Sequence, residues 1–198
     1  MKKIGLFFGS FNPIHIGHLI LANYILEHSD MQELWFVVSP QNPFKEKKSL
    51  LNDHNRLDMV QLAIKNYQKM RASNVEFSLP TPSYTIDTLT YLQEKHPDYS
   101  FSLIMGEDNL GSLHKWKNYD LLLQNHQVIV YPRIFGEDTS SSPNVTQLKN
   151  HHNIHKIDAP IIELSATEIR DMIKSGKNVR PMLPPEVFEY LDGSSFYK

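Results

Sequence analysis

The stretch IGLFFGSFNPIHIGH, residues 4–18, stands near the start of a chain of 198 residues and decides the expected fold. It opens with an apolar run, Ile4 to Phe8, which is rich enough in branched and aromatic residues to form a fully buried strand. Gly9-Ser10 interrupts this run, and Asn12-Pro13 signals a turn. From about Ile16 the apolar residues adopt helical spacing. A strand, a glycine turn and a helix start in this order present unpaired backbone N–H groups to a phosphate.

Two imidazoles, His15 and His18, stand three residues apart at the expected helix start and can face the same side. The positive end of a helix favours anions, so these histidines suit hydrogen bonds to phosphate oxygens better than an ordinary surface position. The alternative is that each is a surface histidine or a satisfied core histidine. We expect His18 to stand clear of the core, so that its replacement by alanine would abolish activity with little effect on folding.

The rest of the chain alternates between strand-like and helix-like segments. Further strands are predicted at Glu33–Ser39, Val75–Leu79, Ser100–Met105, Gln127–Tyr131 and Ile161–Leu164. Helices are predicted to start near residues 16, 53, 84, 119, 165 and 185. This alternation predicts an α/β protein with a Rossmann-like, doubly wound parallel sheet and helices on both faces. In such sheets ligands bind beyond the carboxyl ends of the strands.

Composition indicates one domain over residues 1–198, in which about 165–198 form a small C-terminal helical subdomain. The net charge of −2 argues against a nucleic-acid partner, and no apolar run is long enough to span a membrane. The chain has no cysteine and shows no signal peptide before the first strand, which favours a cytoplasmic location. The sequence leaves open whether the protein forms a homo-oligomer.

A second polar motif, Leu164-Ser165-Ala166-Thr167-Glu168-Ile169-Arg170, follows near the C-terminal end. It matches the capping box of an amphipathic helix, which is the structural alternative for it. Two hydroxyls, the N–H groups of the helix start and an arginine one turn later also make a second anion site. The C-terminal subdomain therefore carries a second phosphate motif.

Both motifs resemble those of the nucleotidyltransferase superfamily that shares His-x-Gly-His with class I aminoacyl-tRNA synthetases. Residues 9–18 resemble its first signature, and residues 164–170 resemble its Ile-Ser-Ser-Thr-x-Ile-Arg motif, which holds the outer phosphates of ATP. As a whole the chain is similar to the bacterial nicotinate mononucleotide adenylyltransferases. Asn12 stands where this family usually has aspartate, and a turn accepts either residue.

The resemblance implies transfer of the adenylyl group of ATP to nicotinate mononucleotide, which gives deamido-NAD and pyrophosphate in NAD biosynthesis. A phosphate monoester has its second pKa near ~6 and is mostly dianionic at neutral pH, so its attack needs no general base. The expected catalytic residues are His15, His18 and Arg170, which neutralise charge that grows in the transition state. Mg²⁺ is the expected cofactor; it is carried by ATP rather than by metal ligands of the protein.

Two sets of binding residues follow from the resemblance. ATP is expected to contact Gly9, Ser10, Phe11, His15, His18, Gly106, Asp108, Arg133, Ser165, Thr167 and Arg170. Nicotinate mononucleotide is expected to contact Asn12, Lys45, Tyr84, Thr85 and Trp116. For Lys45 the alternative is a solvated surface lysine, and for Trp116 it is a core position.

Three other functions stay open at this point. The acceptor is nicotinamide mononucleotide in one of them and phosphopantetheine in another, because related enzymes share both phosphate motifs. In the third, the protein is a nucleotide-binding sensor that has lost catalysis. The intact histidines and Arg170 argue against the sensor, and Ser83-Tyr84-Thr85 with Trp116 argues against phosphopantetheine.

Overall fold

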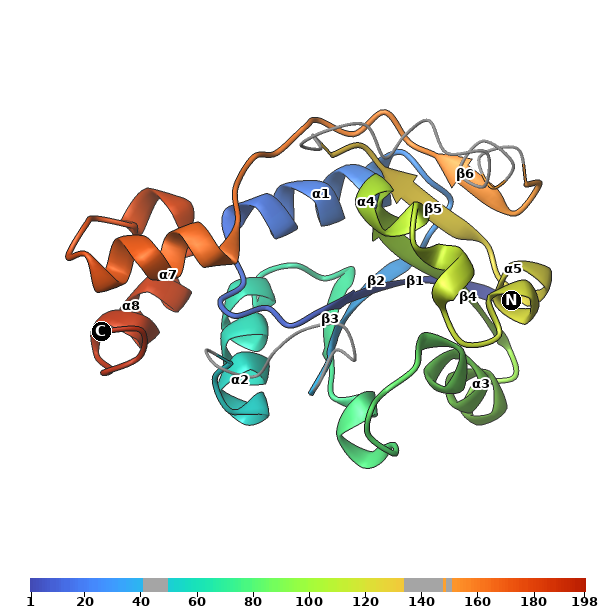
Figure 1. The fold of residues 1–198 in the computed structure, drawn as a ribbon, viewed down its shortest axis with the longest axis horizontal. Coiled ribbons are helices and arrows are strands. Elements are labelled where there is room, and N and C mark those ends of the chain that lie inside the picture. Colours follow the sequence, from blue (N-terminus) through green and yellow to red (C-terminus); the bar gives the residue numbers. More distant parts are fainter. Residues whose placement is uncertain (41–49, 134–147, 149–150) are drawn as a thin grey trace.

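A computed structural model gives the structure of residues 1–40, 50–133, 148 and 151–198. Within these residues, the centre is one sheet of six parallel strands in the order β3-β2-β1-β4-β5-β6 (Figure 1). The strands are β1 (Lys2–Gly9), β2 (Glu33–Val38), β3 (Met70–Ser73), β4 (Tyr99–Gly106), β5 (Val128–Tyr131) and β6 (Ile154–Lys156). The strand order reverses between β1 and β4, as in a doubly wound sheet, so the expected ligand crevice lies at their carboxyl ends.

Helices cover both faces of the sheet, and the predicted fold class is confirmed. They are α1 (Ile16–Glu27), α2 (Asp53–Ile64), α3 (Thr85–Lys95), α4 (Glu107–Leu110), α5 (Tyr119–Asn125), α7 (Ala166–Lys174) and α8 (Pro185–Asp192). Short 3₁₀ helices are η1 (Val75–Ser78), η2 (Leu113–Lys115) and η3 (Arg180–Met182). None of the helices in the described residues is both long enough and apolar enough to cross a membrane.

Side chains of the central strands alternate between two hydrophobic layers. In β1, Ile4 and Leu6 are buried in the layer that contains α3 and α5. Phe7 points into the other layer, which contains α1 and α2. The strand is therefore buried on both faces, which explains why it reads as a continuous apolar run rather than as an alternating one.

The strand predicted at Val75–Leu79 is wrong. These residues form the 3₁₀ helix η1, and the strand that pairs with β2 is Met70–Ser73, with Leu34 opposite Met70. The alternation of apolar and polar residues predicts that Glu76 faces solvent, but Glu76 is buried and bonded to the Thr88 hydroxyl, while Val75 and Phe77 are only partly buried. Hydrophobic periodicity assigns polar residues to the surface, so it cannot predict a glutamate that is buried by a hydrogen bond to a distant residue.

The last predicted strand, Ile161–Leu164, is also wrong. The sixth strand is β6, which lies earlier in the chain at the edge of the sheet. In this short strand only Ile154 is buried, whereas His155 and Lys156 are exposed. An edge strand of three residues with two polar side chains offers no periodic apolar signal.

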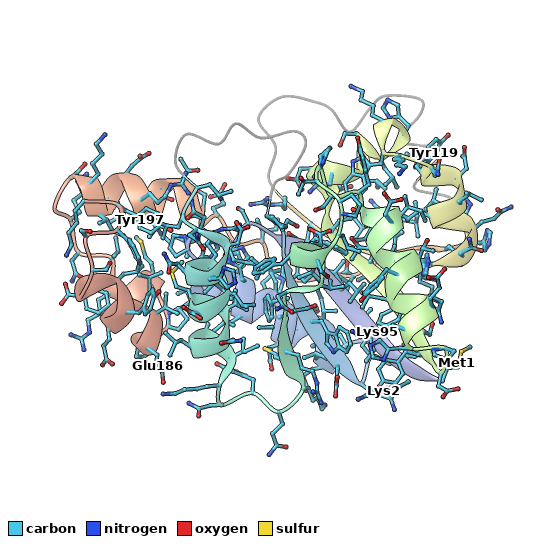
Figure 2. All side chains as sticks on the ribbon, turned by 90° about the horizontal axis from the view of Figure 1, so that it is seen from below. Met1, Lys2, Lys95, Tyr119, Glu186 and Tyr197 are labelled. Atoms are coloured by element: carbon cyan, nitrogen blue, oxygen red, sulfur yellow. The ribbon has the colours of Figure 1, made fainter. Side chains whose placement is uncertain are left out.

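The C-terminal helices belong to the same hydrophobic core as α1 and α2. Ile169 of α7, Val187 and Leu191 of α8, and Val179 and Leu183 on either side of η3 are buried in that cluster. Lys65 at the end of α2 pairs with Glu186 of α8 at 3.0 Å. In Figure 1, α7 and α8 lie together at the end of the molecule opposite the N-terminus, and Figure 2 shows Glu186 and Tyr197 at this end.

Arg56 of α2 is fully buried beneath the carboxyl ends of β1 and β2. Its Nη1 donates to the carbonyls of Ser10 at 2.5 Å and Ser39 at 3.0 Å. Its Nε donates to the Leu51 carbonyl at 3.1 Å, and its Nη2 donates to Asp53 Oδ1 at 2.6 Å. One guanidinium thus joins the turns that follow two neighbouring strands to the start of α2.

Replacing Arg56 by methionine should lower the free energy of unfolding by about 3 kcal/mol, because buried carbonyls then lose their donors. The matched control is Arg71→Met. Arg71 pairs with Glu33 at 2.8 Å, but its side chain is 59% exposed, so its loss should cost less than about 1 kcal/mol. Urea unfolding of the two variants measures both values. Equal losses would show that the Arg56 hydrogen bonds do not stabilise this region.

Candidate active site

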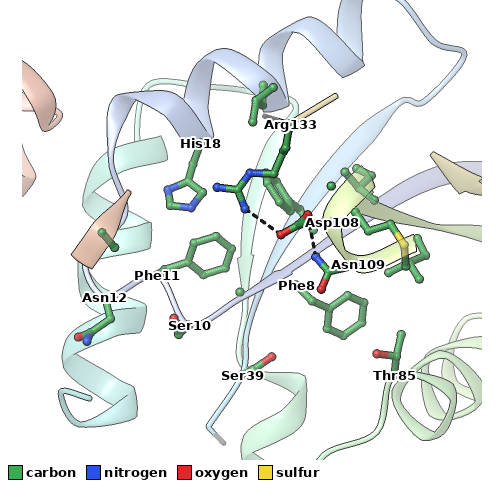
Figure 3. Close-up of a pocket in the computed structure, with 18 of the residues that line it drawn as sticks. Phe8, Ser10, Phe11, Asn12, His18, Ser39, Thr85, Asp108, Asn109 and Arg133 are labelled. Carbon is green, nitrogen blue, oxygen red and sulfur yellow. Dashed lines mark hydrogen bonds and ion pairs between the residues drawn. The ribbon is translucent and has the colours of Figure 1, made fainter. Parts of the chain in front are cut away.

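A cavity of about 760 Å³ opens at the carboxyl ends of β1 and β4, where the strand order reverses. Every predicted site residue in the described part of the chain lines it: Gly9, Ser10, Phe11, Asn12, His15, His18, Tyr84, Thr85, Gly106, Asp108, Trp116, Arg133, Ser165, Thr167 and Arg170. Lys45 lies outside the described residues. Figure 3 shows Asn12 and Ser10 on one side of this space and Thr85 on the other.

The turn after β1 is shaped by Gly9 and Phe11. Phe11 has a φ of +44°, and its ring is buried edge-on against Phe7 and Phe36, with centroids 6.1 and 5.5 Å away. A Cβ on residue 9 would lie 2.8 Å from this ring, so only glycine leaves room for it. The ring anchors the strained turn in the core and exposes the following backbone to the cavity.

His15 and His18 stack at the start of α1, with ring centroids 3.7 Å apart. The backbone N–H of His15 donates to His18 Nδ1 at 3.2 Å, so neutral His18 carries its proton on Nε2. The His18 ring also packs edge-on against Phe7 and Phe11, at 6.0 and 5.2 Å. His18 is only partly buried, so it lies against the core rather than within it, although its ring contacts two core side chains.

Both histidines are uncharged at neutral pH in the free protein. Burial, with a smaller contribution from the Arg133 charge, lowers the pKa of His15 to about 4. Burial, followed by His15 and Arg133, holds the pKa of His18 well below its usual range. Figure 3 shows His18 beside the Arg133 guanidinium. The two imidazoles offer N–H donors, and a bound anion would favour their charged forms.

The second motif starts α7. Ser165 Oγ accepts the Glu168 N–H at 3.1 Å and is the N-cap, as predicted. Arg170 Nη2 donates to Thr167 Oγ1 at 3.1 Å, and Arg170 Nη1 donates to the Asn12 carbonyl at 2.8 Å. The two motifs, which lie 158 residues apart at this contact, are thus joined by one guanidinium.

A third part of the wall follows β4 and β5. Arg133 Nη1 pairs with Asp108 Oδ2 at 3.2 Å, and Asn109 Nδ2 donates to Asp108 Oδ1 at 3.3 Å (Figure 3). A Cβ on Gly106 would overlap Asp108 Oδ1 and would stand 2.7 Å from Arg133 Cδ. Glycine at 106 is therefore needed for this ion pair to form beside the strand end.

The far side of the cavity combines a helix start, two aromatic side chains and an ammonium group. Tyr84 is the N-cap of α3, and its carbonyl accepts the Asp87 N–H at 3.0 Å, whereas the N–H groups of Thr85 and Ile86 have no intrahelical acceptor. Lys117 Nζ lies 4.9 Å from the centroid of the Tyr84 ring and 2.8 Å from Asp87 Oδ2. Trp116 packs partly buried against the neighbouring core. Lys117 was missed from the sequence, where only its position after Trp116 could have indicated it.

Glu76 and Ser83 form a polar part of the wall that the sequence did not reveal. Glu76 Oε1 accepts the Thr88 hydroxyl at 2.8 Å. Burial raises the pKa of Glu76, and hydrogen bonds from Ser39 and Thr88 oppose this shift. Glu76 Oε2 and Ser83 Oγ are buried without a hydrogen-bond partner among the described residues. The misassigned strand at 75–79 concealed this carboxylate.

Asn12 was expected to contact the mononucleotide. In the structure it is buried, and its Oδ1 accepts the Tyr197 hydroxyl at 2.5 Å and the Leu51 N–H at 3.2 Å. Its carbonyl also accepts from Arg170. A carboxylate oxygen could accept the same two donors, which explains why asparagine or aspartate suits this position.

These features together select polyanionic ligands. The starts of α1, α3 and α7 meet the same cavity, and Arg133, Arg170 and Lys117 add positive charge to its wall. A cavity of this volume accommodates a nucleotide-sized molecule. The arrangement can hold phosphate groups on one side and a planar group beside Trp116 and Tyr84 on the other.

Comparison with known proteins identifies relatives over nearly the whole chain. The cytidylyltransferase-like family model matches residues 6–172. A probable nicotinate-nucleotide adenylyltransferase of Flavobacterium johnsoniae is 56% identical over 196 residues, covering 99% of each chain. A protein of the same name from Bacteroides fragilis is 45% identical over 188 residues, covering 94% of this chain and 90% of that protein.

Solved structures show the same fold. The nicotinic acid mononucleotide adenylyltransferase of Plasmodium falciparum complexed with NaAD has a TM-score of 0.81 at 23% identity, covering 100% of this chain and 98% of that chain. The same parasite enzyme complexed with APC has a TM-score of 0.80 at 22% identity, with the same coverage. At this level of identity the likeness supports the architecture alone.

Neutral burial of His15 should make stability depend on pH. Its pKa is about 4 in the folded protein and 6.5 when unfolded, so below pH 6.5 the unfolded chain binds the extra proton. Stability is therefore lost as pH falls from 6.5 to 4, by up to about 3 kcal/mol. In His15→Asn, urea unfolding at pH 7.5, 5.5 and 4.5 should show a smaller loss than in the wild type.

The matched control is His155→Asn, which changes an exposed histidine on β6. Its loss of stability between pH 7.5 and 4.5 should parallel that of the wild type. A His15→Asn variant with the same pH dependence as the wild type would show that His15 is not held neutral.

Proposed function

Because the chain belongs to the nicotinate-nucleotide adenylyltransferase family, we propose that it transfers the adenylyl group of ATP to nicotinate mononucleotide, forming nicotinate adenine dinucleotide (deamido-NAD) and pyrophosphate. The observation that carries this proposal is the contact of Arg170 with both Asn12 and Thr167. It brings two anion-binding motifs to one cavity, as a reaction between two phosphate-bearing substrates requires.

ATP occupies the side of the cavity formed by the two motifs. The start of α7, with Ser165 and Thr167, receives the outer phosphates, and Arg170 neutralises their charge. The turn of Gly9, Ser10 and Phe11 lies against the nucleotide, and its shape requires glycine at position 9 because the Phe11 ring fills the space of a side chain there. His15 and His18 then lie between the outer phosphates and the entering substrate.

Adenylyl transfer forms one bond and breaks one bond at the α-phosphorus. A phosphate oxygen of nicotinate mononucleotide attacks, and the bond to the bridging oxygen of pyrophosphate breaks. The nucleophile is already dianionic near neutral pH, so no side chain has to remove a proton. The Nε2–H of His18 and the guanidinium of Arg170 stabilise the charge that moves onto the α-phosphate and the leaving group.

Gly106, Asp108 and Arg133 complete the ATP side. Asp108 can accept hydrogen bonds from ribose hydroxyls, and Arg133 can contact the phosphates. Their ion pair is partly exposed, with 36% of the Asp108 side chain and 40% of the Arg133 side chain accessible. A pair this exposed is easily exchanged for ligand contacts.

Nicotinate mononucleotide occupies the opposite side. Its pyridine ring stacks on Trp116, and its carboxylate lies at the start of α3, near Thr85 and Tyr84. A helix N-terminus favours a carboxylate over a neutral amide, which supports the nicotinate over the nicotinamide form. Lys45 and Asn12 complete this side in the proposal, with Asn12 acting through the turn that it fixes.

Mg²⁺ enters the proposal as the partner of ATP. Among the described residues, no group of three histidine, aspartate or glutamate side chains is placed to hold a metal ion. The cavity instead offers N–H donors and cationic side chains, which suits an ion held by phosphates and water. Bound in this way, Mg²⁺ supplies additional positive charge at the phosphates.

Pyrophosphate release with ATP and Mg²⁺ tests the acceptor. Nicotinate mononucleotide, nicotinamide mononucleotide and phosphopantetheine are offered in parallel, and we expect kcat/KM to be highest with nicotinate mononucleotide. A higher kcat/KM with nicotinamide mononucleotide would show that the pocket at Thr85 binds the amide rather than the carboxylate. Activity with phosphopantetheine alone would overturn the substrate assignment, and binding of ATP without any turnover would favour a sensor.

Two substitutions separate the roles of the His18 nitrogens. In His18→Asn the side-chain oxygen can replace Nδ1 as acceptor for the His15 N–H, but the Nε2 donor is lost. We expect kcat to fall about 100-fold with little change in melting temperature. His18→Gln can place an amide N–H near the Nε2 position and should retain more activity than His18→Asn. Equal turnover in wild type and His18→Asn would exclude His18 from the chemistry.

A further inference from the structure

The hydroxyl of Tyr197 reaches the turn after β1 from the other end of the chain. It donates to Asn12 Oδ1 at 2.5 Å, across 185 residues of sequence. The same oxygen also accepts the Leu51 N–H, at the longer distance of 3.2 Å. The Tyr197 hydroxyl is the nearer of these two donors and holds the orientation of the Asn12 side chain together with its other contacts.

The tail that carries Tyr197 is held in place by its own contacts. Phe196 and Tyr197 pack against the main core cluster, and the Phe196 ring lies 6.1 Å from that of Tyr190 in α8. Burial raises the pKa of Tyr197 far above its usual range, so its hydroxyl stays protonated and acts as a donor. Figure 2 shows Tyr197 among the C-terminal helices.

Asn12 in turn positions a charged group of the cavity. Its carbonyl accepts Arg170 Nη1 at 2.8 Å, while Arg170 Nη2 donates to Thr167. Rotation of the Asn12 peptide would move this acceptor, and Thr167 Oγ1 would remain as the hydrogen-bond acceptor of the guanidinium among the described residues. A displacement of about 1 Å in a positioning group is enough to reduce turnover strongly.

We propose that Tyr197 is a positioning residue for the reaction: through Asn12 it fixes the turn after β1 and the guanidinium of Arg170, and so locks the two phosphate motifs in register. The C-terminal tail thereby becomes part of the machinery that orders the ATP phosphates. None of the sequence motifs includes this residue.

The test compares Tyr197→Phe with Tyr190→Phe. Both variants lose one hydroxyl and keep the ring. Tyr190 donates to Asn55 at 3.4 Å and, among the described residues, forms no hydrogen bond to either motif, so it is the matched control. Both variants are measured at a temperature well below their melting temperatures. We expect Tyr197→Phe to weaken ATP binding about fivefold and to lower kcat about tenfold. Tyr190→Phe should stay within about twofold of wild type in both.

A double-mutant cycle with Arg170→Ala separates positioning from general stability. If Tyr197 acts by positioning the Arg170 guanidinium, its effect must disappear when that guanidinium is removed. Measured on the affinity for ATP with Mg²⁺, Tyr197→Phe should have no further effect once Arg170 is absent. The same weakening in both backgrounds, or equal effects of Tyr197→Phe and Tyr190→Phe, would overturn the proposal. ATP binding needs no turnover, so this readout stands even if the proposed acceptor is wrong.

Discussion

The turn that follows β1 leaves partly buried backbone carbonyls at the carboxyl end of a central strand, where neither strand nor helix satisfies them. Two arginines supply the missing donors. Arg56, from α2, bonds the carbonyl of Ser10, and Arg170, from α7, bonds the carbonyl of Asn12. Because buried carbonyls without donors are costly, the turn holds its shape only when both helices are packed in place. The cavity therefore depends on the whole fold, although its signature is short.

The site places imidazoles where the surrounding charge is positive. Burial and the Arg133 guanidinium keep His15 and His18 neutral. Neutral imidazoles need no nearby negative charge to offset them when they are buried. Neutral rings still donate N–H hydrogen bonds, and an arriving phosphate reverses the electrostatic preference. The site is thus suited to an anion without carrying a concentrated positive charge in its absence, at the expense of stability in acid.

The sequence was sufficient for the central strands and for the motifs, because β1 is a long apolar run and both helix starts carry local capping or glycine signals. It was insufficient where tertiary contacts decide. Met70–Ser73 and Ile154–Lys156 are short strands paired at the edges of the sheet, and their composition does not mark them. Arg56 and Tyr197 act on atoms distant in sequence, so no local pattern reveals them. Glu76 was not predicted because the alternating residue types at 75–79 place it on a solvent-facing side, whereas it is buried.

The ion pair of Asp108 and Arg133 is a weakly held part of the cavity wall. With both side chains more than a third exposed, the pair contributes at most about 1 kcal/mol, so it constrains the side chains weakly. A triphosphate carries more negative charge than one carboxylate and would attract Arg133 away from Asp108 under the proposed function. Asp108 would then accept from ribose hydroxyls. Gly106 makes this exchange feasible, because a side chain there would occupy the space in which the two groups meet. The rigid elements of the site are thus those fixed by buried hydrogen bonds, and the adaptable element is the exposed pair.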